Sequence, residues 1–272
     1  MVPAGSLWIV FTVLAAAGQT VRNAMQRELT AKLGTVGATH VRFLFGFPFA
    51  LVFLAGVMTA TGYAFPKLPP VFWPWAIVGA GAQIVATATM LATMNDRSFV
   101  VTIAYIKTEA IQAAIFGLIF LGDRLTLPVL VAILIATFGV VVMSLKGKGT
   151  MSGGWQPVAL GLFSGAMFAL SAVGYRGAIL SLEHPSFVLA ATVTVTVGLV
   201  MQAGFLTLYL LVKDRPVLHA IVRNWKPSLF AGFMGATASE FWFLAFAIAT
   251  VASVRTLALI EVLFAQAISF FV

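Results

Sequence analysis

The feature that most limits how this chain can fold is a succession of long apolar runs separated by short connections. About 20 largely apolar residues are needed to cross the hydrocarbon core of a bilayer, and only helices or closed barrels satisfy the backbone there. The runs are rich in Leu, Ala, Val and Phe, and they lack the alternation of barrel strands. They therefore predict membrane-spanning helices.

Nine spans are predicted, which makes an all-α polytopic membrane protein. They cover residues 7–25, 36–60, 71–94, 98–121, 126–145, 155–180, 186–212, 227–249 and 251–272. The connections between them include TGYAFPKLPP, Asn95-Asp96-Arg97, Gly122-Asp123-Arg124 and KGKGTMSGG.

Composition excludes the main soluble classes. Hydrophobic residues make up 61 % of the 272 residues and charged residues 9 %, with a mean hydropathy of +1.05. So little charge cannot coat a water-facing surface, which excludes soluble enzymes and disordered regulators. The net charge is +8, but no basic cluster is interleaved with aromatic residues, so no nucleic-acid partner is expected. Cys is absent and the three His are far apart, so no metal or other cofactor is expected.

Residues in the two halves of the chain correspond at a nearly constant offset. Arg22 and Arg176 are 154 residues apart, a Leu-Ala pair recurs after 153, and Glu109 and Glu261 are 152 apart. This pattern predicts two five-helix repeats, one in residues 1–148 and one in residues 153–272. An odd number of helices per repeat places the repeats in opposite orientation, an architecture that recurs in secondary transporters.

The second repeat is expected to lack its last helix. The chain ends within an apolar run at ISFFV, and adding 152 to Lys146 puts the end of a complete second repeat near residue 298. The alternative is a natural nine-helix protein.

Charges in the connections predict the orientation. The connections after the first, third, fifth and seventh spans hold nine cations: Arg27, Lys32, Arg97, Lys146, Lys148, Lys213, Arg215, Arg223 and Lys226. The other connections hold only Lys67 and Arg124. Because cytoplasmic loops are enriched in Lys and Arg, this count puts the N-terminus outside the cytoplasm.

Several segments resemble a known family. SFVVTIAYIKTEAIQAAIFGLIFLGD, followed by RLTLPVLVAILIATFGVVVMSL, resembles the end of an EamA repeat, with its Gly-acidic-x-Leu-Thr connection at residues 122–126. HVRFLFGFPFALVFL resembles the second helix of that repeat, and VASVRTLALIEVLFAQAISFF resembles the second copy of its fourth helix. The chain thus resembles EamA-type transporters of the drug/metabolite transporter superfamily.

The resemblance implies two inverted five-helix repeats and a transporter integral to the cytoplasmic (inner) membrane. This chain departs from the family at the second Gly-acidic connection and the tenth helix, which are missing. Family members are usually described with both termini in the cytoplasm, which opposes the charge count.

Ionisable residues at bilayer depth are the candidates for function, because each is costly to bury there. Glu109 lies near the middle of its span, and Glu261 holds the corresponding place in the second repeat. Two such carboxylates facing one cavity suit coupling to protons, while the alternative is that cations neutralise both. Lys107 is about 200° from Glu109 on a regular helix, so the two are not expected to share a face, and Lys107 becomes a candidate anion contact.

Other polar and aromatic residues complete the candidate site. Arg176, Arg22 and Arg255 can bind a substrate carboxylate or phosphate, but snorkelling to the headgroups is favoured for Arg22 and Arg255. Glu240 is expected either in the site or in an ion pair with Arg255 or Arg176. The remaining candidates are Gln112, for hydrogen bonds, and Tyr105 and Trp242, for stacking. Asp96 and Asp123 are expected to be solvated caps.

These residues favour a secondary transporter of a small organic metabolite. We expect alternating access, outward transport, and coupling to protons or exchange, with the lipid bilayer and the small-molecule substrate as partners. The alternatives are an intramembrane enzyme, which lacks a visible nucleophile–base pair, and a channel or non-transporting scaffold. The sequence identifies neither the substrate nor the oligomeric state.

Overall fold

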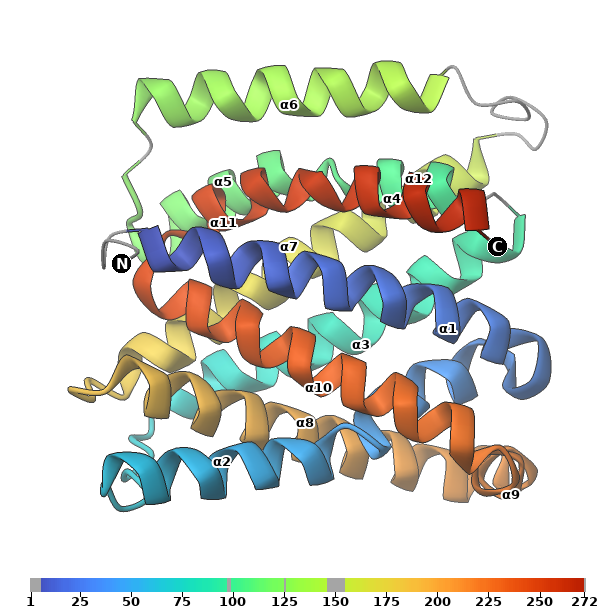
Figure 1. The fold of residues 1–272 in the computed structure, drawn as a ribbon, viewed down its shortest axis with the longest axis horizontal. Coiled ribbons are helices and arrows are strands. Elements are labelled where there is room, and N and C mark those ends of the chain that lie inside the picture. The colour runs from blue at the N-terminus through green and yellow to red at the C-terminus, as the bar shows by residue number, and fades with distance from the viewer. Residues whose placement is uncertain (1–5, 97–98, 125, 146–154, 272) are drawn as a thin grey trace.

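The computed structural model describes residues 6–96, 99–124, 126–145 and 155–271, which form an all-helical protein (Figure 1). Its helices, in chain order, are α1 (Leu7–Leu44), α2 (Phe47–Thr61), α3 (Phe72–Asp96), α4 (Phe99–Ile106), α5 (Glu109–Leu121), α6 (Leu127–Leu145), α7 (Gln156–Ser181), α8 (Phe187–Lys213), α9 (Arg215–Arg223), α10 (Trp225–Ile248), α11 (Val251–Leu257), the 3₁₀ turn η2 (Ala258–Ile260) and α12 (Glu261–Phe271).

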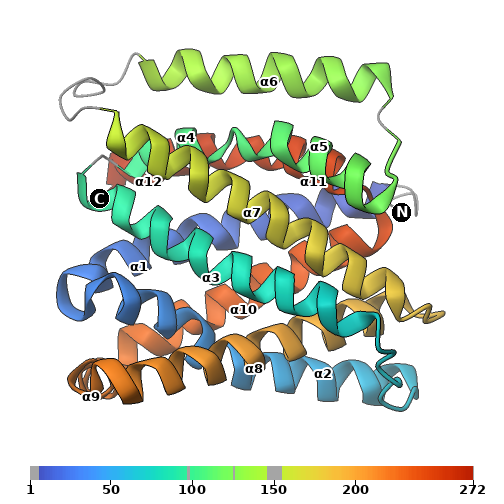
Figure 2. The same cartoon turned by 180° about the vertical axis from the view of Figure 1, so that it is seen from behind.

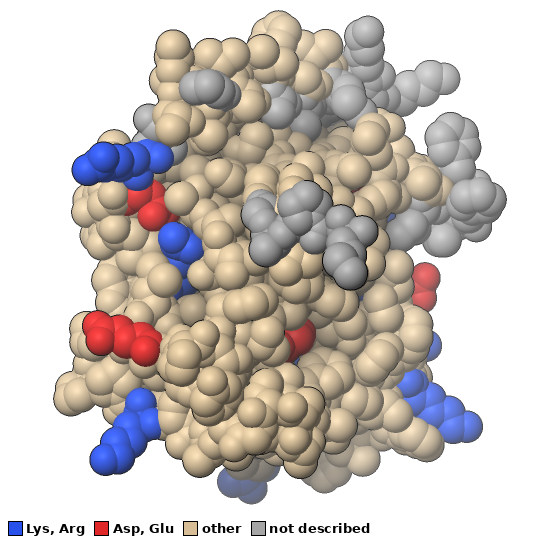
Figure 3. All heavy atoms as spheres, turned by 60° about the vertical axis from the view of Figure 1, so that its left-hand side comes forward, with Lys and Arg blue, Asp and Glu red and all other residues tan. Residues whose placement is uncertain are grey.

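Six helical segments among the described residues are long and apolar enough to cross a membrane. They are Leu7–Thr61, Phe72–Asn95, Val101–Leu121, Gln156–Ser181, Phe187–Lys213 and Trp225–Ile248. The outer faces of α6 and α8 expose large apolar side chains: Phe138 is 71 % exposed and Val212 73 %. Charged side chains form only scattered spots on the face in Figure 3. Such a surface suits lipid, and the chain is a multi-pass membrane protein.

The predicted connection between the first two spans is largely helical instead. α1 continues through residues 26–33 and bends at Gly34, where φ is 67° and ψ is 173°. A positive φ is accessible to glycine at little cost, so Gly34 allows the chain to turn back within α1 (Figure 1). Leu7–Thr61 is 55 residues long, so it has room for two crossings.

Two other predicted spans are not continuous helices. The span predicted at 98–121 breaks between α4 and α5, and the one at 251–272 breaks between α11 and α12. The polar stretch before α10 contains the short helix α9, which the sequence did not predict. The predicted connection at 146–154 and the side chains of Asp96 and Arg97 lie outside the described residues.

Small residues allow the central helices to pack closely. α3 packs along α7, as Figure 2 shows, and a methyl group at Gly174 would lie 2.7 Å from the backbone nitrogen of Gly79. Hydroxyls complete the contact, because Ser171 donates to the carbonyl of Gly79 and Ser164 to that of Ala86, both at 2.8 Å. Small residues and interhelical hydrogen bonds hold helices together in lipid, where helix burial gains no hydrophobic free energy.

Candidate functional site: two broken helices and a buried ion cluster

The first broken helix contributes the carboxylate of Glu109. Around Lys107 and Thr108 the backbone bonds shorten to the i−3 pattern: Thr108 N–H donates to Tyr105 O at 3.3 Å, and Ala110 N–H to Lys107 O at 3.4 Å. α5 restarts with Glu109 as its first residue. The positive end of the α5 dipole therefore lies beside this carboxylate and stabilises its charge.

The second broken helix repeats this arrangement. η2 separates α11 from α12, and Glu261 is the first residue of α12. α11 packs against α5, while α12 packs against α4. The two broken helices therefore run side by side in opposite directions, as Figure 1 also shows, and their breaks lie next to each other.

Lys107 joins the two carboxylates. Its Nζ lies 2.9 Å from Oε2 of Glu261 and 3.3 Å from Oε1 of Glu109. The expectation that Lys107 and Glu109 cannot share a face is wrong, because the helix is interrupted between them and the regular 100° rotation per residue does not apply. All three side chains are 1 % exposed.

Arg255 completes the charge balance of this ion cluster, which consists of Lys107, Glu109, Glu261 and Arg255. Its Nη1 lies 3.5 Å from Oε1 of Glu109. The expected snorkelling of Arg255 is wrong, since its residue is 5 % exposed and lies inside the protein. Two cations and two carboxylates thus form a balanced group, the condition under which buried charges are tolerated.

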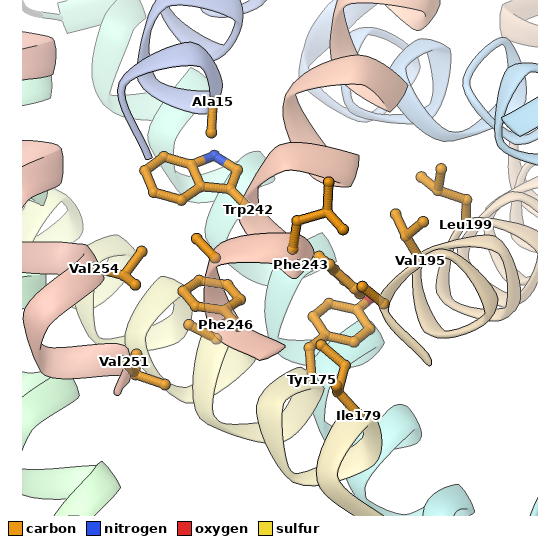
Figure 4. Packing of buried hydrophobic residues seen from close by; sticks show 14 of the residues in the cluster. Ala15, Tyr175, Ile179, Val195, Leu199, Trp242, Phe243, Phe246, Val251 and Val254 are labelled. Carbon is orange, nitrogen blue, oxygen red and sulfur yellow. The ribbon is translucent and has the colours of Figure 1, made fainter. Parts of the chain in front are cut away.

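Aromatic rings form one wall beside the ion cluster. The guanidinium of Arg255 lies over the ring of Trp242 at 4.6 Å and over that of Phe246 at 5.3 Å. Figure 4 shows Trp242, Phe243 and Phe246 on α10 packed with Tyr175 of α7. The structure thus places Trp242 beside the ion cluster, where its ring stacks on Arg255; stacking on a substrate stays a prediction.

Gln19 of α1 is a member of the site that sequence reasoning missed. Its amide nitrogen donates to both oxygens of Glu261, at 2.8 and 3.0 Å, and its carbonyl oxygen accepts from Nε1 of Trp242 at 2.9 Å. The only signal in the sequence was a glutamine inside the first apolar run.

Arg176 of α7 lies away from the ion cluster and contacts the C-terminal end of α10. It donates to the carbonyls of Phe246 and Ala249, and its Nη2 lies 3.6 Å from Oδ1 of Asp123. Asp123 is 11 % exposed and paired, so its expected role as a solvated cap is wrong. The geometry gives Arg176 the task of fixing the turn between α10 and α11.

Glu240 is also separate from the cluster. Its Oε1 accepts a 2.5 Å hydrogen bond from Thr192 of α8, and no ion pair to Glu240 occurs among the described residues. The expected pairing with Arg255 or Arg176 is therefore wrong, because those arginines have Glu109 and Asp123 as their partners.

Tyr105 and Gln112 pack on α7 rather than on the carboxylates. A methyl group at Gly161 would lie 2.7 Å from Cβ of Tyr105, and one at Gly165 would lie 2.8 Å from the carbonyl oxygen of Ile106. Gln112 donates to the carbonyl of Leu162 at 3.5 Å. The two glycines thus let α7 lie directly against the break between α4 and α5.

Arg22 is buried as well, which overturns its expected snorkelling. It is 0 % exposed, and its nearest polar partner is Oδ1 of Asn23, at 2.7 Å from Nη2. In the part of the chain that the structure describes, no group of three or more His, Asp or Glu is placed to hold a metal ion.

Comparisons with known proteins support the fold alone. No protein-family model matches the chain, and no curated protein matches it in sequence. Fifteen chains of solved structures match. One of them, described only as "Crystal structure of protein", aligns with a TM-score of 0.70 over 98 % of this chain and 88 % of its own, at 13 % identity. At that identity the likeness establishes a shared all-helical fold.

Proposed function

We propose that the protein is a secondary transporter that moves a small organic metabolite across the cytoplasmic membrane by alternating access. One observation carries this proposal. Two broken helices run in opposite directions and bring Glu109, Glu261 and Lys107 together inside a multi-pass membrane protein. Discontinuous helices that meet in the protein interior are a recurring way for transporters to build substrate and ion sites.

The proposal includes the EamA-like architecture, with inverted repeats in residues 1–148 and 153–272. In support, each broken helix restarts at a glutamate, and the two glutamates are 152 residues apart. The ion cluster crosses between the proposed repeats, because Glu261 contacts Lys107 and Gln19, while Arg255 contacts Glu109.

Because these contacts join the two proposed repeats, the ion cluster has the role of a gate. Rocking of one repeat against the other must separate Glu261 from Lys107 and Arg255 from Glu109. A proton on either carboxylate removes one charge from a balanced group and weakens the attraction across the boundary. In the proposed cycle, a proton taken up by one carboxylate accompanies opening of the cluster, and its release accompanies closing.

Reconstituted transport tests the proposal. The full chain is placed in liposomes with a pH-sensitive dye inside, and pooled metabolites are supplied outside. We expect a substrate-dependent change of internal pH that Glu109→Gln and Glu261→Gln reduce at least tenfold, while Glu28→Gln, which alters an exposed carboxylate of α1, leaves it unchanged.

Two outcomes contradict the proposal. Parental rates and pH dependence in both cluster variants would remove the carboxylates from the mechanism. A conductance that does not saturate with solute would favour a channel instead, and the absence of flux, counterflow and conductance for every pool would favour a scaffold.

A further inference from the structure

Two buried arginines next to the ion cluster have no acidic partner. Arg22 of α1 is 0 % exposed and Arg42, near the end of the same helix, is 1 % exposed. No carboxylate of the described residues lies within ion-pair distance of either. Nη1 of Arg22 and Nε of Arg42 have no hydrogen-bond partner at all.

The two arginines lie at one place in the fold. Both side chains pack against Gly235 of α10: a methyl group there would lie 3.2 Å from Cδ of Arg22 and 3.3 Å from Cγ of Arg42. Their charges act on each other, and those of Glu261 and Arg255 also reach Arg22. The glycine therefore lets both side chains, which come from different parts of α1, pack against the same place on α10.

The hydrogen-bond partners of the two arginines are neutral. Arg42 donates to the hydroxyl of Thr87 at 3.1 Å and to that of Ser239 at 3.5 Å. Arg22 donates through Nε and Nη2 to the amide oxygen of Asn23. These oxygens orient the guanidiniums but carry no negative charge, so they do not neutralise the pair.

The buried positive charges near the two arginines are not matched by negative ones. Among the described residues, the interior holds the four buried cations Arg22, Arg42, Lys107 and Arg255, of which Lys107 and Arg255 pair with Glu109 and Glu261. A third interior carboxylate, Glu240, is hydrogen-bonded to Thr192 and pairs with neither arginine. The ion cluster is balanced within itself, so the positive charges left without an ion pair belong to Arg22 and Arg42. Isolated charges are costly to remove from water, and two adjacent like charges raise that cost further.

We propose that Arg22 and Arg42 form the binding site for an oxyanion, a carboxylate or phosphate group of a small molecule. The planar guanidinium matches such groups through two parallel hydrogen bonds, and two arginines can hold both negative charges of a phosphate or a dicarboxylate. The donors left without a partner, Nη1 of Arg22 and Nε of Arg42, are available for these bonds. An oxyanion between the arginines neutralises their excess charge.

The site is closed in this conformation. Because both arginines are sealed from solvent, an anion reaches them only after the helices around them have moved. If the protein transports, as proposed above, the ligand of this site is its substrate, which is then a small organic anion. Binding itself does not depend on transport and is measured separately.

Ligand-dependent thermal unfolding of the purified full chain in detergent tests the site. The probes are inorganic phosphate, succinate and, as a neutral analogue of similar size, succinamide, all at constant ionic strength. We expect phosphate or succinate to raise Tm in a saturable way and succinamide to have no effect. In Arg22→Met and Arg42→Met, the apparent affinity falls by about tenfold or more, because each loses a charge-assisted pair of hydrogen bonds.

The unliganded variants separate a binding role from a structural one. If the arginines only support the fold, Arg22→Met and Arg42→Met lower Tm without ligand. If they bind an anion and are uncompensated charges without it, the unliganded variants have an equal or higher Tm and lose only the ligand-dependent shift. Arg27→Met is the matched control, since Arg27 is an exposed arginine on the same helix, and we expect it to keep the full shift.

Each contrary result has a distinct meaning. No saturable shift with phosphate or succinate, or an equal shift in the parent and both arginine variants, overturns the anion site. An anion-dependent shift in a protein that transports nothing supports the site and contradicts the proposed function. Transport that needs Glu109 but is indifferent to Arg22→Met and Arg42→Met contradicts the assignment of this site to the transported substrate and leaves the proposed function standing.

Discussion

The two broken helices resemble each other in design but differ in how their glutamates are held. Glu261 is fully engaged: Gln19 donates to both of its oxygens, and Lys107 lies 2.9 Å from Oε2. Glu109 contacts Lys107 and Arg255 through Oε1 only, at 3.3 and 3.5 Å, and its Oε2 has no hydrogen-bond partner. One carboxylate is locked in place, while the other retains an open position.

The difference arises because the cation lies at a different number of residues before the glutamate in each broken helix. At the offset of 152, Lys107 corresponds to Leu259 and Arg255 corresponds to Ile103. The first break therefore has its cation two residues before the glutamate, and the second has it six residues before. Lys107 reaches both carboxylates and Arg255 reaches one, so the same local architecture gives one fixed and one adaptable acid.

The largest effect is expected from Lys107→Met. This change leaves Glu261 without a cation, and loss of one partner of a buried ion pair costs about 3–5 kcal/mol. The free energy of unfolding, measured with denaturant in detergent, is the readout. Lys67→Met is the control, because Lys67 is exposed, and it is expected to change little. Equal effects of the two substitutions would mean that Lys107 is not the link between the breaks.

Gln19→Leu tests the bonds that distinguish Glu261 from Glu109. It removes the donor to Glu261 and leaves Nε1 of Trp242 without an acceptor, a loss of about 1–3 kcal/mol. Tryptophan fluorescence should shift in the folded protein, and the free energy of unfolding should fall. Gln156→Leu, at an exposed glutamine, serves as the control. Unchanged stability and fluorescence would show that Gln19 does not fix Glu261.

A smaller effect is expected from Arg255→Lys, which keeps the charge near Glu109 but loses the flat guanidinium over Trp242 and Phe246. Cation–π contacts are worth about 0.5–2 kcal/mol, and a lysine retains part of that. The predicted result is a modest loss of stability with transport retained, while Arg255→Met removes both the charge and the stacking. If Arg255→Lys and Arg255→Met have equal stability and transport, the carboxylate of Glu109 does not require a cation from the second broken helix.

The sequence predicted the helices well where an apolar run ends at polar residues. The predicted spans 155–180 and 186–212 correspond to α7, Gln156–Ser181, and α8, Phe187–Lys213. The apolar pattern contained no signal for the two breaks. Neither Lys107-Thr108 nor Ala258–Ile260 contains Gly or Pro, the residues that most often interrupt a helix. Tertiary packing against α7 and between the two broken helices, rather than local propensity, places them there.

The candidate site was predictable in part. The constant offset pairs Glu109 with Glu261, and the structure places both carboxylates against Lys107. The partners of Lys107 were mispredicted because the chain between Lys107 and Glu109 is not a regular helix. Arg22 and Arg255 were assigned to the membrane surface from their positions near span ends, but α1 extends past the predicted end at residue 25, and α11 lies inside the bundle.

A double-mutant cycle on Lys107 and Glu261 tests most directly whether the two breaks meet through an ion pair. Lys107→Met alone leaves the carboxylate of Glu261 uncompensated. Adding Glu261→Gln removes that charge, keeps an oxygen for Gln19, and leaves Glu109 paired with Arg255 at 3.5 Å. We predict that the double variant is more stable than Lys107→Met, with a coupling of about 1–3 kcal/mol in the free energy of unfolding. Simple addition of the two single effects would contradict the ion pair that links the two breaks.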